Sequence, residues 1–207
     1  MSDSILQTES IKETAALRLA GVTMAMVNAE MRWTLMEFLA ETRIWRRVIT
    51  LAPVAGQRDY ELPIEDYESV KLLMSASYGD RNILRGLTFG LEQTGSPSGV
   101  GMITDRILRV SPTPTASETS LITVDVCLTI LPIMDAEPPD EIRPYSQVLL
   151  DGLLGRLYAI PDKPWTDIRF AAAHYAAWRS GISTTRREME MGRMHGYTMA
   201  RFPRGGM

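Results

Sequence analysis

The residue types that most often carry enzyme or metal chemistry are scarce in this sequence. Its 207 residues include two histidines, His174 and His195, and one cysteine, Cys127. A histidine-rich metal site is therefore excluded. A lone cysteine can supply neither an intramolecular disulfide nor the paired thiolates of a zinc ribbon. We expect Cys127 to be a small residue within a strand.

His174 is the strongest candidate for a general base, with Asp167 as a neighbouring acid. It stands four residues from both Phe170 and Trp178, which on a helix favours a packed ring with one hydrogen bond. No nucleophile completes a catalytic set. We therefore predict no catalytic residue and no cofactor, and an enzyme using His174 with Asp167 stays an alternative.

Two further patterns resemble functional motifs without matching them. Gly95-Ser-Pro-Ser-Gly99 has Pro97 where a nucleophile elbow needs a central serine. Four acids surround Pro138-Pro139 but lack the ligand spacing of a calcium loop: Asp135, Glu137, Asp140 and Glu141. We interpret them as a solvated loop that begins a helix, and we expect no metal.

The charge is unevenly distributed. The chain has a net charge of -3 and a pI near 5.5, which argues against a protein whose main task is gripping nucleic acid. Residues 186–207 hold five arginines and two glutamates, so they carry +3 and residues 1–185 carry -6. Apolar stretches end well short of the roughly 18 residues that a membrane span needs. We expect an acidic body, a basic tail and no membrane partner.

The N-terminal residues 1–44 have the pattern of a helix. Ser10-Ile-Lys-Glu13 has the form of a capping box, which predicts a helix start at Ser10. Apolar residues then follow at steps of mostly three and four, which predicts one buried stripe: Leu17, Ala20, Met24, Val27, Met31, Leu35 and Phe38. Gly21 is expected to break or bend the helix.

Residues 45–132 have the short extended runs of an antiparallel β lobe. We expect a hairpin of Val48–Leu51 with Tyr60–Leu62. Further strands are predicted at Ser69–Met74, Ile83–Phe89, Arg106–Val110 and Leu121–Leu131. The last is the clearest, because alternate residues from Ile122 to Ile130 are apolar. The Gly- and Ser-containing stretch Glu92–Met102 is predicted to be a surface loop.

Helical periodicity returns after Pro139. Leu150, Leu153, Leu154 and Leu157 define one buried stripe. A last helix is predicted from about Thr166 to Glu190, with these residues inward: Ile168, Ala171, Ala172, Tyr175 and Ile182, and Phe170, His174 and Trp178 at the margin. Residues 138–190 would then form a helical hairpin. Residues 191–207 have neither period and are predicted to be an extended arm.

These elements predict an α+β fold. We expect residues 1–190 to form one domain, in which the helical parts 1–44 and 138–190 pack together and the β lobe 45–132 is inserted between them. The arm 191–207 would extend from this domain.

Two motifs in this order carry a resemblance. The first is G-Q-x-x-Y-x-L-P, here Gly56, Gln57, Tyr60, Leu62 and Pro63. The second is L-x-x-L-Y-x-x-P-x-x-P-W, here Leu154, Leu157, Tyr158, Pro161, Pro164 and Trp165. With them, residues 20–190 resemble the head-tail connector adaptors, or head completion proteins, of tailed bacteriophages.

The resemblance implies a structural virion protein and no enzyme. Such adaptors form rings, usually dodecameric, that dock under the portal and carry tail or neck proteins. The protein would lie in the neck of the virion, after assembly in the host cytoplasm. Double-stranded DNA would pass through the ring without specific binding. A tail-tube or nozzle component of the same virion is the alternative.

The arm is the candidate interface with the portal or a neighbouring subunit. It alternates arginines with methionines and aromatic residues, a combination enriched at interfaces: Arg193, Met194, Tyr197, Met199, Arg201, Phe202 and Arg204. A segment this short and rich in glycine would order only on a partner. A frayed, solvated tail and an arm that contacts DNA are the alternatives.

Overall fold

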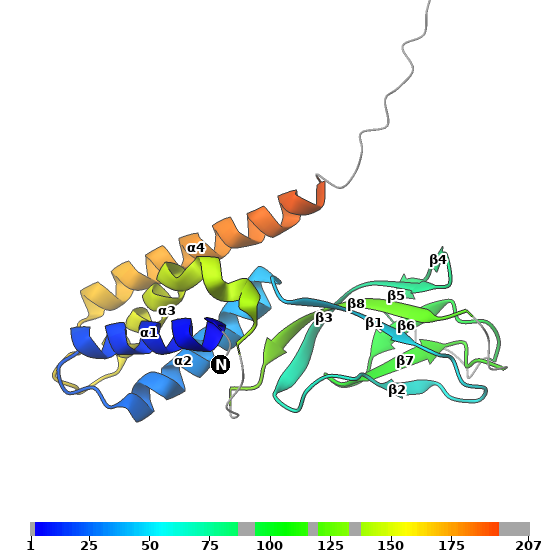
Figure 1. The fold of residues 1–207 in the computed structure, drawn as a ribbon, viewed down its shortest axis with the longest axis horizontal. Coiled ribbons are helices and arrows are strands. Elements are labelled where there is room, and N and C mark those ends of the chain that lie inside the picture. Colours follow the sequence, from blue (N-terminus) through cyan, green and yellow to red (C-terminus); the bar gives the residue numbers. More distant parts are fainter. Residues whose placement is uncertain (1–2, 87–93, 116–119, 133–137, 195–207) are drawn as a thin grey trace, which may run out of the picture.

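The computed structural model describes residues 3–86, 94–115, 120–132 and 138–194. Helices gather at one end of the molecule and strands at the other, as Figure 1 shows. We call the part made of α1 to α4 the helical lobe and the part made of β1 to β8 the β lobe. The predicted α+β class is confirmed.

The N-terminal part forms two helices instead of the single helix predicted. α1 spans Asp3–Arg18 and α2 spans Met24–Thr42. The start predicted at Ser10 is wrong, because Ser10 lies inside α1 and its carbonyl accepts a hydrogen bond from Thr14 Oγ1. The break falls at Gly21, which has a φ of 88°. Thr23 then caps α2 by accepting a hydrogen bond from the amide of Met26.

The break also divides the predicted apolar stripe. Four of its five α2 members are buried as expected: Val27, Met31, Leu35 and Phe38. Leu17, however, is 88% exposed on α1, and Ala20 and Met24 are exposed as well. The buried side of α1 consists instead of Thr8, Ile11 and Ala15, and Leu19, just after the helix, is buried as well.

The C-terminal helices form a closely packed pair. The 3₁₀ helix η1 spans Asp140–Tyr145, α3 spans Ser146–Ala159 and α4 spans Ile168–Met194. A Cβ built on Gly152 would lie 2.6 Å from Trp178 Cε3, and one on Gly181 would lie 2.6 Å from Val148 Cγ1. Glycine at these two positions therefore allows the helices to approach closely.

Two predictions for α4 are wrong. Trp178, expected at the margin, is fully buried at the centre of the contact, whereas Ile168 and Ala172, expected inward, are exposed. The helix also continues to Met194, so the arm predicted from residue 191 cannot begin before residue 195. Residues 195–207 lie outside the described residues.

The first sheet has the order β1-β8-β3-β4. β1 spans Arg46–Leu51, β8 spans Ile122–Ile130, β3 spans Glu68–Tyr78 and β4 spans Arg81–Asn82. The alternation predicted for β8 is confirmed, since its even-numbered residues from Ile122 to Ile130 are buried. The predicted hairpin is wrong: β1 pairs with β8, while the segment around Tyr60 belongs to the other sheet.

The second sheet has the order β2-β7-β6-β5. β2 spans Asp59–Glu61, β7 spans Ile107–Ser111, β6 spans Gly99–Met102 and β5 spans Leu84–Arg85. β6 corrects the loop predicted at Glu92–Met102, because its Val100 is buried and paired with Val110. The strand predicted at Ile83–Phe89 is confirmed in part: Leu84–Arg85 forms β5, and residues 87–93 lie outside the described part. The β5–β6 pair is parallel, whereas the other strand pairs formed by the described residues are antiparallel.

The two lobes meet where α2 covers the end of β8. Thr129 Oγ1 donates a hydrogen bond to the carbonyl of Met36 at 2.9 Å. Cys127 is buried in the same place, with Sγ 3.9 Å from the carbonyl of Arg43. Burial raises the pKa of the Cys127 thiol. The cysteine is thus a small strand residue under a helix, as its sequence context predicts.

Candidate interaction surfaces

The first motif forms a turn before β2. Gly56 has a φ of 75°, and its amide donates to the carbonyl of Pro114 at 2.8 Å. Tyr60 Oη donates to the carbonyl of Gln57 and accepts from the amide of Val54, both at 3.0 Å. Leu62, on the same side of the strand as Tyr60, is also buried. Gly56, Gln57, Tyr60 and Leu62 therefore have an architectural role.

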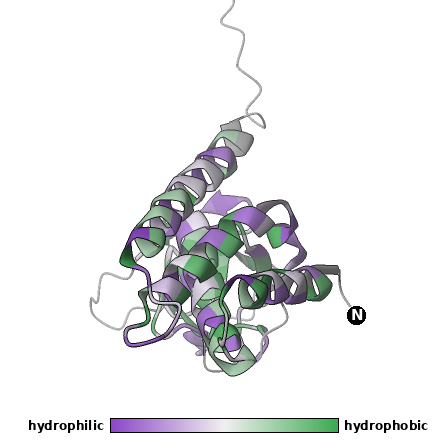
Figure 2. Ribbon diagram, turned by 90° about the vertical axis from the view of Figure 1, so that its left-hand side faces the viewer, coloured by the Kyte–Doolittle hydropathy of each residue, from purple (hydrophilic) through white to green (hydrophobic). Residues whose placement is uncertain are grey.

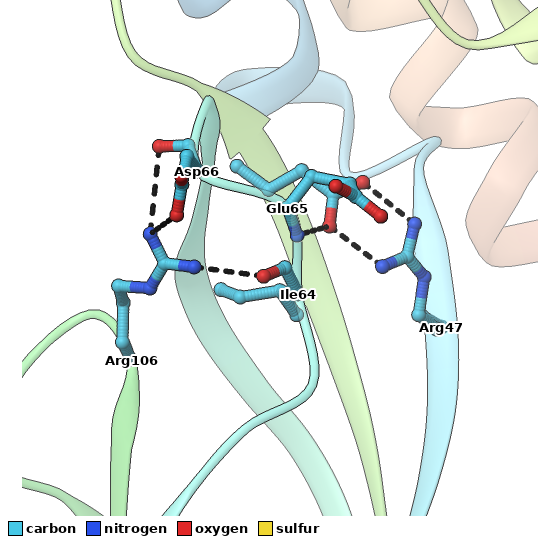
Figure 3. Close-up of polar contacts among 6 residues, drawn as sticks. Arg47, Ile64, Glu65, Asp66 and Arg106 are labelled. Carbon is cyan, nitrogen blue, oxygen red and sulfur yellow. Dashed lines mark hydrogen bonds and ion pairs between the residues drawn. The ribbon is translucent and has the colours of Figure 1, made fainter.

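The chain after this motif is held between arginines of both sheets (Figure 3). Arg47 of β1 donates two hydrogen bonds of 2.6 Å to the carboxylate of Glu68. Glu68 is 1% exposed and also accepts from the amide of Glu65 at 2.9 Å. On the other side, Arg106 contacts Asp66 and donates to the carbonyl of Ile64 at 2.7 Å. A bidentate arginine thus fixes the bend that leads from β2 into β3.

The second motif shapes the connection between α3 and α4. Thr166 Oγ1 accepts from the amide of Lys163 at 3.0 Å and donates to the carbonyl of Ile160 at 2.5 Å. Trp165 is half-buried, and a Cβ built on Gly21 would lie 3.7 Å from its Cζ3. The indole therefore lies between this connection and the turn that joins α1 to α2. Pro161 and Pro164 are exposed on the outside of the loop.

His174 is a packing residue with one hydrogen-bond partner. Its Nδ1 lies 2.8 Å from Asp151 Oδ1 on α3, and its ring stacks on Tyr158 at a centroid distance of 5.7 Å. The pairing with Asp167 expected for the enzyme alternative is wrong. Asp167 instead caps α4 by accepting hydrogen bonds from the amides of Arg169 and Phe170.

The acidic residues near Pro139 begin a helix, as predicted. Asp140 and Glu141 form the first turn of η1, and Asp140 pairs with Arg143 at 3.0 Å. Asp135 and Glu137 lie outside the described residues. Within the ranges that the structure describes, no three His, Cys, Asp or Glu side chains gather closely enough to hold a metal ion. No helix in those ranges is long and apolar enough to cross a membrane.

The predicted interface residues are divided between helix and undescribed chain. The backbones of Arg193 and Met194 belong to the last turn of α4. The others lie beyond the described residues: Tyr197, Met199, Arg201, Phe202 and Arg204.

Sequence reasoning missed the exposed apolar residues of the helical lobe. They include Leu6 and Leu17 on α1 and Ile168, Phe170 and Met191 on α4. The prediction places Leu17 on a buried stripe because it continues one helical period from Leu17 to Phe38, whereas these residues belong to two helices. The signal that could have found it is the second apolar repeat of α1, which runs opposite to Ile11, Ala15 and Leu19.

The fold is that of an elongated α+β structural subunit. The residues of its two motifs shape the turn before β2 and the connection between α3 and α4. The SU10 adaptor protein family model matches residues 6–200, nearly the whole chain. The chain belongs to this family of phage head-tail adaptors, and the resemblance drawn from its two motifs is confirmed. No curated protein matches the sequence.

Proposed function

We propose that this chain forms a ring that joins the portal to the tail and surrounds the path of the DNA in the virion neck. The observation that carries the proposal is the family match over residues 6–200. The shape is consistent with it, because an elongated subunit with a helical end and a β end can contact different partners at its two ends (Figure 1).

The charge supports a channel through which DNA slides. Residues 1–185 carry a formal charge of -6. A neutral to negative lumen offers few cations for phosphate neutralisation and counterion release, the main source of tight DNA binding. A chain that ends at Met194 should therefore show no salt-sensitive retention of duplex DNA. Tight binding by this truncated chain would contradict the proposed lumen.

The C-terminal segment is the proposed docking element. The end of α4 leads into residues 195–207, whose aromatic residues and arginines can fill a groove and pair with carboxylates on the portal or on a neighbouring subunit. Its ordering costs roughly 1–2 kcal/mol per residue, which these anchors must offset.

Deletion of residues 195–207 tests the docking role. The truncated chain should keep the circular dichroism spectrum of the full chain but fail to cosediment with portal-bearing heads. A full-length control with Arg201→Lys and Arg204→Lys separates charge from arginine geometry, since it keeps both cations. Undiminished cosedimentation of the truncated chain would show that the segment has no docking role.

A further inference from the structure

α1 has a second apolar stripe that its own lobe does not use. Leu6, Ser10, Glu13 and Leu17 are all exposed and follow one another at steps of four, three and four. Leu17 protrudes most. Steps of three and four are the spacing of a helix that packs along a partner helix. The opposite side of α1, with Thr8, Ile11 and Ala15, already packs inside the lobe.

α4 has an exposed stripe with the same spacing and a different composition. It runs along the side opposite Trp178 and consists of Arg169, Ala173, Ala176, Ser180, Ser183 and Arg187. Its four central side chains are small, so a partner helix can approach the α4 backbone closely. An arginine stands at each end. A third exposed arginine, Arg179, flanks the stripe.

The two stripes are complementary in charge. Glu13 is the one charged residue of the α1 stripe, whereas the charged residues of the α4 stripe from Arg169 to Arg187 are both arginines. The next position on this side of α4 is Glu190, which is paired with Arg186. Among the described residues, Glu13, Arg169, Arg179 and Arg187 form no ion pair. A carboxylate facing such arginines would be attracted, and two α4 stripes facing each other would repel.

They are also complementary in shape and length. At 1.5 Å per residue, Leu6 and Leu17 are separated by about 17 Å along α1, and Ala173 and Ser183 by about 15 Å along α4. The leucines can therefore act as knobs over the part of α4 where small residues leave room.

Within one chain the two stripes cannot meet. α3 contacts both α1 and α4 and lies between them. Figure 2, which looks onto the helical end, shows α1 beside the label N, well apart from the helix that leads into the grey trace at the top, which is α4. A contact between the two stripes therefore requires two copies of the chain.

We infer that α1 of one copy packs against α4 of the next, through the stripe Leu6, Ser10, Glu13 and Leu17 and the stripe from Arg169 to Arg187. A contact between two different surfaces of identical subunits is head-to-tail, and such contacts generate rings when the rotation closes. The inference rests on the proposed ring and names the interface that holds it.

Two substitutions test this interface, one in each stripe. Leu17→Arg places a cation opposite the arginines of α4, and Ala176→Arg fills the space over its small residues. Both positions are exposed, so the folded chain should keep its circular dichroism spectrum and denaturation midpoint. Leu84→Arg and Ala52→Arg, at exposed positions of the β lobe and its loops, are the matched controls.

Native mass spectrometry, with and without the portal protein of the same virus, gives the readout. Each stripe variant alone should be monomeric, while both controls form the wild-type ring. An equimolar mixture of the two stripe variants should form dimers that contain one copy of each. Such a pair keeps one intact α1–α4 contact and cannot extend further.

Other outcomes overturn the inference in distinguishable ways. If both stripe variants form rings, the proposed ring is supported but this interface is contradicted. If the Ala176→Arg variant alone forms dimers, two α1 stripes contact each other. If the Leu17→Arg variant alone forms dimers, two α4 stripes contact each other. A wild-type chain that assembles in neither condition would contradict the proposed ring itself.

Discussion

The helical lobe and the β lobe are stabilised in different ways. In the helical lobe, glycines bring α3 against α4, and the Trp178 indole lies over Gly152. In the β lobe, bidentate arginines connect neighbouring chain segments: Arg47 of β1 reaches Glu68 of β3 across the sheet, and Arg109 of β7 binds Asp59 of the paired strand β2, at 2.6–2.7 Å. One lobe depends on close apolar contact and the other adds charge-assisted hydrogen bonds.

This difference indicates which residues stabilise the chain and which are available to bind partner proteins. Because the core of the helical lobe is apolar and closely packed, the charged and apolar residues on its outer sides contribute little to its own stability and are available to partners. In both lobes paired charges, such as Arg47 with Glu68 and Arg156 with Glu37, are already engaged inside the chain. Substitutions of exposed residues on the outer sides of the helical lobe should therefore reveal partners, whereas substitutions of buried residues in either lobe should cost stability.

The largest loss of stability is expected in the helical core. Trp178→Ala removes a ring that is 1% exposed and should lower the free energy of unfolding by about 3–5 kcal/mol. Trp33→Ala is the matched control, because Trp33 is half exposed on α2 and should cost much less. Chemical denaturation measures both. Equal losses for the two variants would contradict the packing described.

The bidentate pair of the β lobe should come next. Arg47→Ala leaves the Glu68 carboxylate buried without its cation and should cost about 2–4 kcal/mol. Arg143→Ala removes an arginine from the exposed pair with Asp140 and should change stability by about 0.5 kcal/mol or less. If both variants unfold at the same denaturant concentration, the buried pair does not hold the bend.

Trp165 should have an intermediate effect. Its ring is half-buried and, among the described residues, its buried Nε1 has no hydrogen-bond partner. Trp165→Ala should cost about 1–2 kcal/mol, less than at Trp178. Trp165→Phe keeps most of the apolar contact without the unpaired donor, so it should cost less than alanine. A loss for phenylalanine as large as that for alanine would show that the indole nitrogen, which both variants lack, carries the stabilisation.

The smallest effect concerns pH. The hydrogen bonds from Arg109 hold the pKa of Asp59 below its usual value, although burial opposes the shift. A carboxyl with a lowered pKa in the folded state contributes stability above its unfolded pKa of about 4, and this contribution is lost as the pH falls. Arg109→Met should therefore destabilise the chain more at pH 7 than at pH 3. A difference between the two proteins that is independent of pH would argue against the pair.

The sequence allowed the individual helices and strands to be predicted better than the segments with which they pair or pack. The period of β8 and the leucine stripe of α3 are local, so both were predictable. The pairing of β1 with β8 joins segments about 80 residues apart, and nothing in either segment specifies it. Likewise, Trp178 is central because Gly152 faces it from another helix, which the sequence of α4 alone cannot show.

For the candidate surfaces, too, local features could be predicted from the sequence and contacts between distant segments could not. The two motifs were sufficient to indicate the family, because each fixes a local turn. Asp151 was missed as the partner of His174, since it lies 23 residues earlier on α3. The break expected at Gly21 is confirmed. The outer stripe of α1 was missed because the predicted apolar stripe continues through that break with one helical period.

Averaged images of the purified chain bound to the portal protein of the same virus test the central claim most directly. The account predicts a closed ring of this chain coaxial with the portal, with an open central channel and with neighbouring helical lobes in contact. Isolated copies scattered on the portal, or density that fills the channel, would contradict it.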